Sequence, residues 1–194
     1  MSFGEHKASP QKKLPRSYQA GKLLTFVVNE FKSFTHKTDQ PRRIELISNQ
    51  NNLSFYVTEL VEKNFLAHTV IAEFEYHIGG SLPGQAKIQL EHTGNLRRTG
   101  IRARLKQGGD DLTTLIQTLQ TDPQFLQAII PLDFNTFYLI QDHDGWRVQT
   151  TQVGASWVNM AFPPVRRYVK MGPEQIEALL ATFNRLQTIL GNQI

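Results

Sequence analysis

Residues 67–92, AHTVIAEFEYHIGGSLPGQAKIQLEH, decide the fold class of this chain. In the first half of this stretch, apolar residues occupy every second position from Val70 to Ile78, and the positions between them are mostly polar. Such alternation predicts a β-strand with one buried face. The loop GGSLPG then leads to a second alternating segment, AKIQLEH, as expected for a β-hairpin.

Further alternating segments extend the predicted sheet on both sides. IRARLK (101–106) follows the loop TGNLRRTG, and it completes an antiparallel meander with the strands at 67–78 and 86–92. The turn DHDG joins two more strands, because aspartate and glycine tolerate the positive φ angles of tight hairpins. The remaining predicted strands are IELIS (44–48), LSFYVTEL (53–60), FNTFYLI (134–140), WRVQTTQ (146–152) and ASWVNMAF (155–162).

Apolar residues at helical spacing predict four helices. The first covers residues 17–34, and the polar segment HKTDQPRR (36–43) that follows is interpreted as a connection. Two short helices begin near Asp110 and Asp122, since aspartate is a favourable N-cap. The last begins at Pro173, and we expect it to pack across the sheet. Because strands occur in blocks, the sequence predicts an α+β fold: antiparallel hairpins and meanders packed against N-terminal, central and C-terminal helices.

The composition excludes several classes of protein. Its 194 residues are 40% hydrophobic and 20% charged, and no 18-residue apolar run predicts a membrane span. There is no cysteine, which excludes disulfides, thiolate zinc sites and a cysteine nucleophile. The first 22 residues have no apolar segment typical of a secretory signal, so we expect a cytoplasmic protein.

The formal net charge of +4 is unevenly distributed along the chain. Residues 1–22 hold five basic residues against the single acid Glu5, so the remainder of the chain is neutral overall. We therefore predict a mobile basic arm over residues 1–16 and a single α+β domain over residues 17–194.

Motifs for cofactors and catalysis are missing. The sequence has neither a Walker A loop nor a G-x-G-x-x-G loop that opens a helix, and GASWV lacks the final glycine of a nucleophile elbow. Asp142, His143 and Asp144 form the densest group of metal ligands, but adjacent residues in a tight turn generally cannot converge on one ion. No cofactor or metal is predicted.

Two groups of side chains remain as candidate sites. Glu73, Glu75 and His77 share one strand face, and they could meet Arg102 or Arg104 across the sheet to form a polar site. An enzyme based on them would need a closed pocket; on an open face they would be solvated ion pairs. The basic stretch forms the best anion-binding candidate, since arginine suits phosphate. Its members are Arg97, Arg98, Arg102, Arg104 and Lys106.

A second, shorter basic pair follows two prolines near the C-terminus. Arg166 and Arg167 lie between this proline pair and Tyr168. They either clamp a reversal of the chain or bind an anion, and the first interpretation is favoured.

Two short motifs carry a resemblance to a known family. SLPGQAKIQLEH, and PPVRRYV followed by the leucine-rich last helix, resemble a family of small uncharacterised bacterial proteins, known as a domain of unknown function. The similarity covers the chain from about residue 50 to the C-terminus. It implies a bacterial, soluble protein without an assigned activity, and it assigns no functional residues.

The leading functional hypothesis is a non-catalytic binding or interaction module. The missing catalytic motifs, the 12 phenylalanines and the sorted charges favour a sheet surface, or a groove between sheet and helices, that takes a partner protein or a small apolar ligand. One alternative is phosphate or nucleic-acid binding through the basic arm and the Arg97–Lys106 stretch. Another is an enzyme of unknown class that uses His77 with Glu73 or Glu75.

Overall fold

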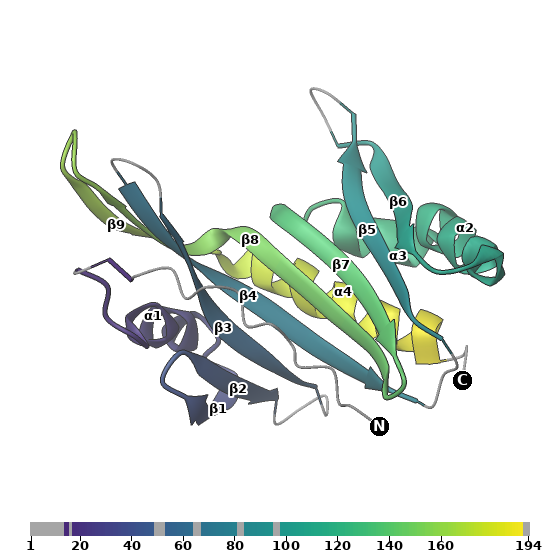
Figure 1. Ribbon diagram of the computed structural model, residues 1–194, viewed down its shortest axis with the longest axis horizontal. Coiled ribbons are helices and arrows are strands. Elements are labelled where there is room, and N and C mark those ends of the chain that lie inside the picture. Colours follow the sequence, from purple (N-terminus) through teal and green to yellow (C-terminus); the bar gives the residue numbers. More distant parts are fainter. Residues whose placement is uncertain are drawn as a thin grey trace, which may run out of the picture.

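The computed structural model shows a large antiparallel sheet with helices (Figure 1). It describes residues 14–15, 17–48, 53–63, 67–80, 84–94 and 98–191. The helices are α1 (Lys22–Glu30), a 3-10 turn η1 (Asp110–Leu112), α2 (Thr113–Thr121), α3 (Pro123–Ile129) and α4 (Pro173–Gly191). The strands are β1 (Phe34–Gln40), β2 (Arg43–Ser48), β3 (Ser54–Lys63), β4 (Ala67–Gly79), β5 (Ala86–Thr93), β6 (Gly100–Gln107), β7 (Phe134–Asp142), β8 (Gly145–Met160) and β9 (Val165–Val169). The predicted α+β class is confirmed.

All nine strands belong to one sheet. Its order is β1-β2-β3-β4-β8-β7-β5-β6, and β9 pairs with β8. The 16-residue strand β8 pairs with β4 along one edge. Along its other edge, its first part pairs with β7 and its last part pairs with β9. The change of partner falls near Ala155, whose φ of 50° marks an irregularity in the strand. Figure 1 shows β8 and β9 extending from the main body as a hairpin.

The core lies between the sheet and the helices, which cover one of its faces. The ring of Phe55 on β3 contacts Phe31, just after α1, and Phe183 on α4, at centroid distances of 5.7 and 5.5 Å. Phe183 also stacks on Tyr76 of β4 at 5.0 Å. The alternation of β4 therefore faces the helices with Val70, Ala72, Phe74, Tyr76 and Ile78, as the sequence predicts. The expected packing of α4 across the sheet is confirmed (Figure 1).

Helix α1 is shorter than the sequence predicts, because a buried carboxylate fixes its start. Glu59 of β3 is completely buried and accepts hydrogen bonds from the amides of Gly21 (3.0 Å) and Leu23 (2.9 Å) and from the hydroxyl of Tyr18. The first amides of a helix have no partner within the helix, so this carboxylate satisfies them. The helix consequently begins at Lys22 instead of Ser17.

The predicted meander is wrong, although its strands exist. β4 pairs with β3 and β8, while β5 pairs with β7 and β6, so two strands separate β4 from β5. The β7–β8 hairpin is inserted between them through the DHDG turn, where Gly145 has a φ of 125°. A side chain at this glycine would place its Cβ 2.3 Å from the carbonyl oxygen of Ile78, so glycine allows β8 to lie against β4.

Three further differences concern polar or long strands. Residues 36–40 of the predicted connection belong to the edge strand β1, whose exposed side chains remove the alternation that indicates a strand. The two strands predicted at 146–152 and 155–162 are parts of the single strand β8. Arg166 and Arg167 belong to the strand β9, directly after the β8–β9 turn.

One hydrophobic cluster contains buried residues from α1, the sheet and α2 to α4. The arm predicted over residues 1–16 falls outside the described residues, apart from Leu14 and Pro15. Among the described helices, none combines the length and the apolar content needed to cross a bilayer.

Candidate functional site

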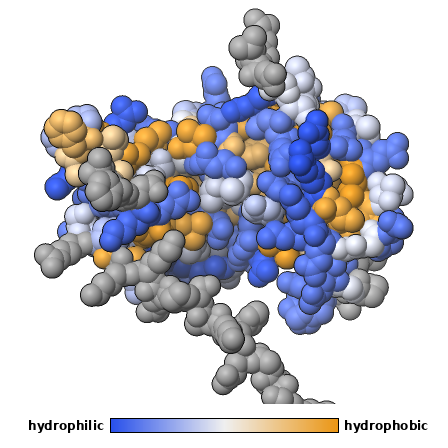
Figure 2. All heavy atoms as spheres, turned by 45° about the horizontal axis from the view of Figure 1, so that its top comes forward, coloured by the Kyte–Doolittle hydropathy of each residue, from blue (hydrophilic) through white to orange (hydrophobic). Residues whose placement is uncertain are grey.

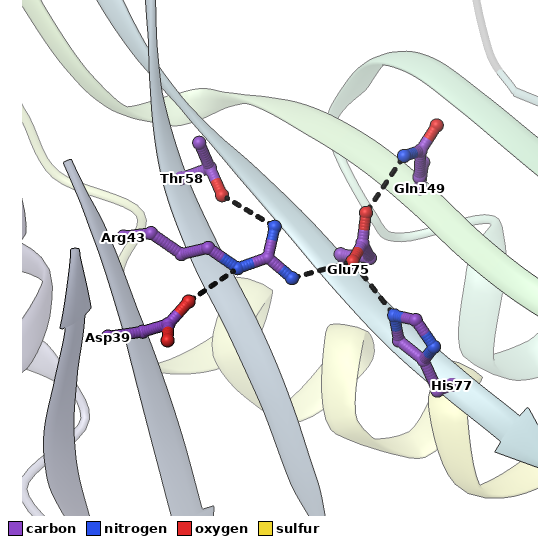
Figure 3. Close-up of polar contacts among 6 residues, drawn as sticks. All are labelled: Asp39, Arg43, Thr58, Glu75, His77 and Gln149. Carbon is purple, nitrogen blue, oxygen red and sulfur yellow. Dashed lines mark hydrogen bonds and ion pairs between the residues drawn. The ribbon is translucent and has the colours of Figure 1, made fainter.

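The predicted polar site lies on the sheet face opposite the helices, around the carboxylate of Glu75 (Figure 3). Glu75 is 7% exposed and is contacted by Arg43 Nη2 (2.8 Å), His77 Nε2 (2.8 Å) and Gln149 Nε2 (2.9 Å). Arg43 also approaches Asp39, at 3.4 Å. The contact between Glu75 and His77 follows from their positions two residues apart on one strand.

The expected arginine partners of this site are wrong. Arg102 and Arg104 lie on β6, which is four strands away from β4 in the sheet order. Arg43 of β2 supplies the guanidinium instead, because Thr58 of β3 pairs with both Arg43 and Glu73 and so places Arg43 near these carboxylates.

The electrostatics of this cluster favour a structural role. The hydrogen bond from His77 is the largest cause that holds the pKa of Glu75 far below its ordinary value; burial opposes it, and Gln149 and Arg43 add to the lowering. Burial, and then the charge of Glu75, raise the pKa of Glu73. A carboxylate with so low a pKa is a weak base. Neither Glu73 nor Glu75 lines the small pocket of about 130 Å³ beside His77, so the three do not share a cavity in the described structure.

The predicted anion-binding stretch is divided and largely paired with acids. Arg104 Nε lies 3.0 Å from Glu91 Oε2, and Arg102 is the register partner of Glu91. Arg98 forms an ion pair with Asp133 and donates to the carbonyl of Leu132 at 3.1 Å. The remaining members are Lys106, which is exposed near the end of β6, and Arg97, which lies outside the described residues.

A different group of polar side chains lies side by side because of strand pairing. Lys63 of β3 pairs with His68 of β4, His68 pairs with Asn159 of β8, and Asn159 pairs with Arg166 of β9. Residues directly opposite each other in antiparallel strands project to the same face. These four side chains therefore form a row on the helix-covered face, beyond the start of α1.

This row lines a pocket of about 380 Å³, which we call the basic pocket. His68 is only 9% exposed. Asn159 Nδ2 donates to Ser17 Oγ at 3.2 Å and lies 3.4 Å from His68 Nε2. The residues that complete the wall are Pro15, Ala67, Met160, Ala161 and Pro164. No aspartate or glutamate lines this pocket in the described part of the chain.

The surroundings of the His68 ring hold its pKa below the ordinary value. Burial is the largest cause that lowers its pKa, and the charges of Arg166 and Lys63 lower it further. The imidazole is therefore neutral at about pH 7. In the neutral form Nε2 can accept the contact from the Asn159 amide. The two permanent cations, Lys63 and Arg166, have no carboxylate beside them among the described lining residues.

The sequence interpretation missed the basic pocket because its members are far apart in the chain. Lys63 and His68 flank the β3–β4 turn, while Asn159 and Arg166 flank the β8–β9 turn. Within each pair, the two residues lie at equal distances from the centre of their turn, and this spacing places their side chains opposite each other in the hairpin. This spacing is the signal that the sequence contains. Only the neighbouring arginines 166 and 167 were considered, and the favoured interpretation for them was structural.

Other surface features give weaker candidates. Asp142, His143 and Asp144 have potential metal-ligating atoms within 4.8 Å of one another, but they lie in the β7–β8 turn, and His143 and Asp144 are exposed. A groove of about 620 Å³ lies between α3 and α4, and an ion pair with Asp122 neutralises Arg185, the one arginine in its described lining. Hydrophilic residues cover most of the face seen in Figure 2, with hydrophobic residues in separate patches.

Comparisons with known proteins identify a family. No curated protein and no solved structure matches the chain. The sequence profile of one family, described as "Protein of unknown function (DUF3156)", matches residues 29–190, which confirms and extends the resemblance predicted from residue 50 onward. The chain therefore belongs to this family of proteins of unknown function.

Proposed function

We propose that this chain is a non-catalytic binding module that holds a small anionic ligand in the basic pocket. One observation carries this proposal: Lys63, His68 and Arg166 converge on a pocket of about 380 Å³ whose described lining contains no carboxylate. The side chains of Lys63 and Arg166 are exposed, so both cations are accessible to an anion that enters from solvent, and the nearly buried imidazole of His68 lies between them. The geometry thus supports an anion over the small apolar ligand expected from the sequence.

The donors of the pocket suit an oxyanion. Arg166 offers a planar fork of N–H groups and Lys63 offers a compact charge. Asn159 already contacts Ser17 and His68, so it holds the imidazole in place beside these cations. The volume of about 380 Å³ lies near the lower end of the range of roughly 300 to 1,000 Å³ for small-molecule sites. We therefore favour a small molecule over a nucleic-acid chain.

The alternative sites have less support. Arg98 and Arg104 of the basic stretch already contact Asp133 and Glu91. An enzyme that uses His77 with Glu73 or Glu75 would need a closed pocket, and these residues lie on an open sheet face, where the side chain of His77 is 53% exposed.

Calorimetric titration with inorganic phosphate and with sulfate tests the proposal. We expect saturable binding at one site, and about a ten-fold loss of affinity in Arg166→Gln, because hydrogen bonds to charged groups contribute about 1.5 to 3 kcal/mol. The matched control is Arg167→Gln: Arg167 is the neighbouring residue on the same strand, pairs with Val158 and is absent from the pocket lining. It should bind like the unmodified protein. The proposal is wrong if neither anion binds, or if both variants lose affinity equally.

A further inference from the structure

The arrangement of the basic pocket narrows the class of anion, on the assumption that the proposed function holds. We infer that the ligand is a small phosphomonoester whose dianionic group lies between Lys63 and Arg166, and that His68 takes up a proton when this group binds. The inference rests on the number of donors, on the apolar part of the wall and on the surroundings of His68.

The number of donors fits a group with three terminal oxygens and two charges. Lys63, His68 and Arg166 come from three different strands, with Asn159 between the last two. A phosphomonoester has three strong acceptor oxygens and a charge near −2 at neutral pH, whereas a carboxylate has two oxygens and one charge. In either protonation state of His68, a bound dianion leaves the pocket with one positive charge fewer than a bound carboxylate does.

The other part of the wall suits the organic group of such an ester. Pro15, Ala67, Met160, Ala161 and Pro164 contribute mainly apolar surface beside the row of donors. Inorganic phosphate has five heavy atoms and would leave much of the 380 Å³ to water. An ester with a compact apolar group would displace this water and gain affinity from the burial of that group.

The surroundings of His68 make its protonation depend on the ligand. Lys63 from β3 and Arg166 from β9 oppose its positive charge, and Asn159 from β8 is uncharged. A second cavity, of about 20 Å³, adjoins the imidazole, and its charged lining residues are Lys22 of α1 and Glu59 of β3. Glu59 is already bonded to Tyr18 and to the start of α1. A bound dianion would therefore supply the negative charge beside the imidazole that the described lining of the basic pocket lacks.

The sign of the proton linkage follows from these contacts. In the empty pocket the pKa of His68 lies below its ordinary value, mainly because of burial. A dianion beside the ring favours the charged form and raises this pKa. Binding therefore takes up a proton between the two pKa values, and affinity increases as pH falls through the higher one. The ester itself has a pKa near 6, so sulfate, which stays dianionic, isolates the contribution of His68.

Calorimetry with phenyl phosphate in buffers of different ionisation enthalpy measures this proton uptake. We expect uptake that approaches one proton in the full chain and no uptake in His68→Gln, which keeps a polar side chain but does not titrate. Phenyl phosphate should bind at least about ten times more tightly than benzoate, since it offers a second charge to the same cations. Proton NMR of the His68 ring should show a higher pKa with saturating sulfate than without it.

The outcomes separate this inference from the proposed function. Binding of phenyl phosphate without proton uptake, or with the same affinity as benzoate, would overturn the inference and leave the anion site intact. Failure of phosphate, sulfate, phenyl phosphate and benzoate to bind would overturn both. If thermal unfolding shows that His68→Gln does not fold, the NMR titration of the unmodified protein decides the question alone.

Discussion

Two groups of basic side chains on this sheet differ in what lies next to them. The cations of β6 are close together in the sequence, and Arg104 among them is paired with Glu91 of the adjacent strand. The cations of the basic pocket are more than 100 residues apart in the sequence, at Lys63 and Arg166, and no described carboxylate lines their pocket. Strand pairing, and not sequence proximity, therefore determines which positive charges remain without a partner.

This difference determines how readily each group of cations binds an anion. A ligand that approaches Arg104 must compete with a carboxylate that is already in contact. A ligand in the basic pocket meets two permanent charges and a nearly buried imidazole. The following substitutions either make the pocket resemble β6 or test the charges that are already balanced.

A carboxylate placed in the pocket should have the largest effect. Asn159→Asp puts an acid between His68 and Arg166, so the pocket would resemble the paired cations of β6. We expect phosphate affinity to fall by about 2 kcal/mol or more, roughly 30-fold, because the new charge repels the ligand. Calorimetric titration measures this loss. The control Asn184→Asp changes the net charge equally on the exposed side of α4 and should bind normally; equal affinities in both variants would contradict the account.

Removal of a balanced charge should reduce stability. Glu75→Gln weakens three hydrogen bonds, to Arg43, His77 and Gln149, and should lower the free energy of unfolding by about 2 kcal/mol. Urea denaturation measures this change. Glu62→Gln, at an exposed position of β3, is the control and should change stability by less than about 0.5 kcal/mol.

The same comparison has a defined dependence on pH. Because the folded pKa of Glu75 is lowered, its contribution is fully present above the ordinary value of 4.5 and is lost as pH falls toward the lowered pKa. The stability difference between the unmodified protein and Glu75→Gln should therefore shrink in acid. A difference that grows in acid would contradict the assignment.

Removal of an unbalanced charge should have the opposite effect on stability. Arg166 has no ion pair among the described residues, and its positive charge repels that of Lys63 in the same pocket. Arg166→Gln should therefore leave the free energy of unfolding unchanged or raise it by about 0.5 kcal/mol in anion-free buffer. Added phosphate should stabilise the unmodified protein more than this variant, since at a given phosphate concentration the stabilisation increases with affinity. Urea denaturation with and without phosphate distinguishes these results from a structural ion pair, whose loss would destabilise the protein.

The smallest effect is expected at β6. Arg104→Gln removes an exposed ion pair, so stability should change by less than about 0.5 kcal/mol and phosphate affinity by less than about two-fold. A larger loss of affinity would move the binding site to the basic stretch that the sequence singles out.

The sequence predicted the faces of the strands better than their neighbours. The alternation of Val70 to Ile78 identifies the buried face of β4, and the DHDG turn identifies the β7–β8 hairpin, because both are local properties. The order of strands depends on contacts between distant segments. β5 follows β4 in the chain but pairs with β7, so the predicted meander and the predicted contact of Glu75 with Arg102 or Arg104 are both wrong.

The same reason limits what could be predicted of the site. Glu75 and His77 are two residues apart on one strand, so their contact could be anticipated, whereas Arg43 could not. The basic pocket depends on two separate turns, at residues 63–68 and 159–166, and on the adjacency of β4 and β8. Only the last step requires knowledge of the three-dimensional fold.

Chemical-shift mapping with inorganic phosphate tests the central claim most directly. In amide spectra of the full chain, the account predicts saturable shifts that are largest at Lys63, His68, Asn159 and Arg166, with little change at Arg102 and Arg104. Shifts concentrated on β6, or an unchanged spectrum in the presence of phosphate, would contradict it.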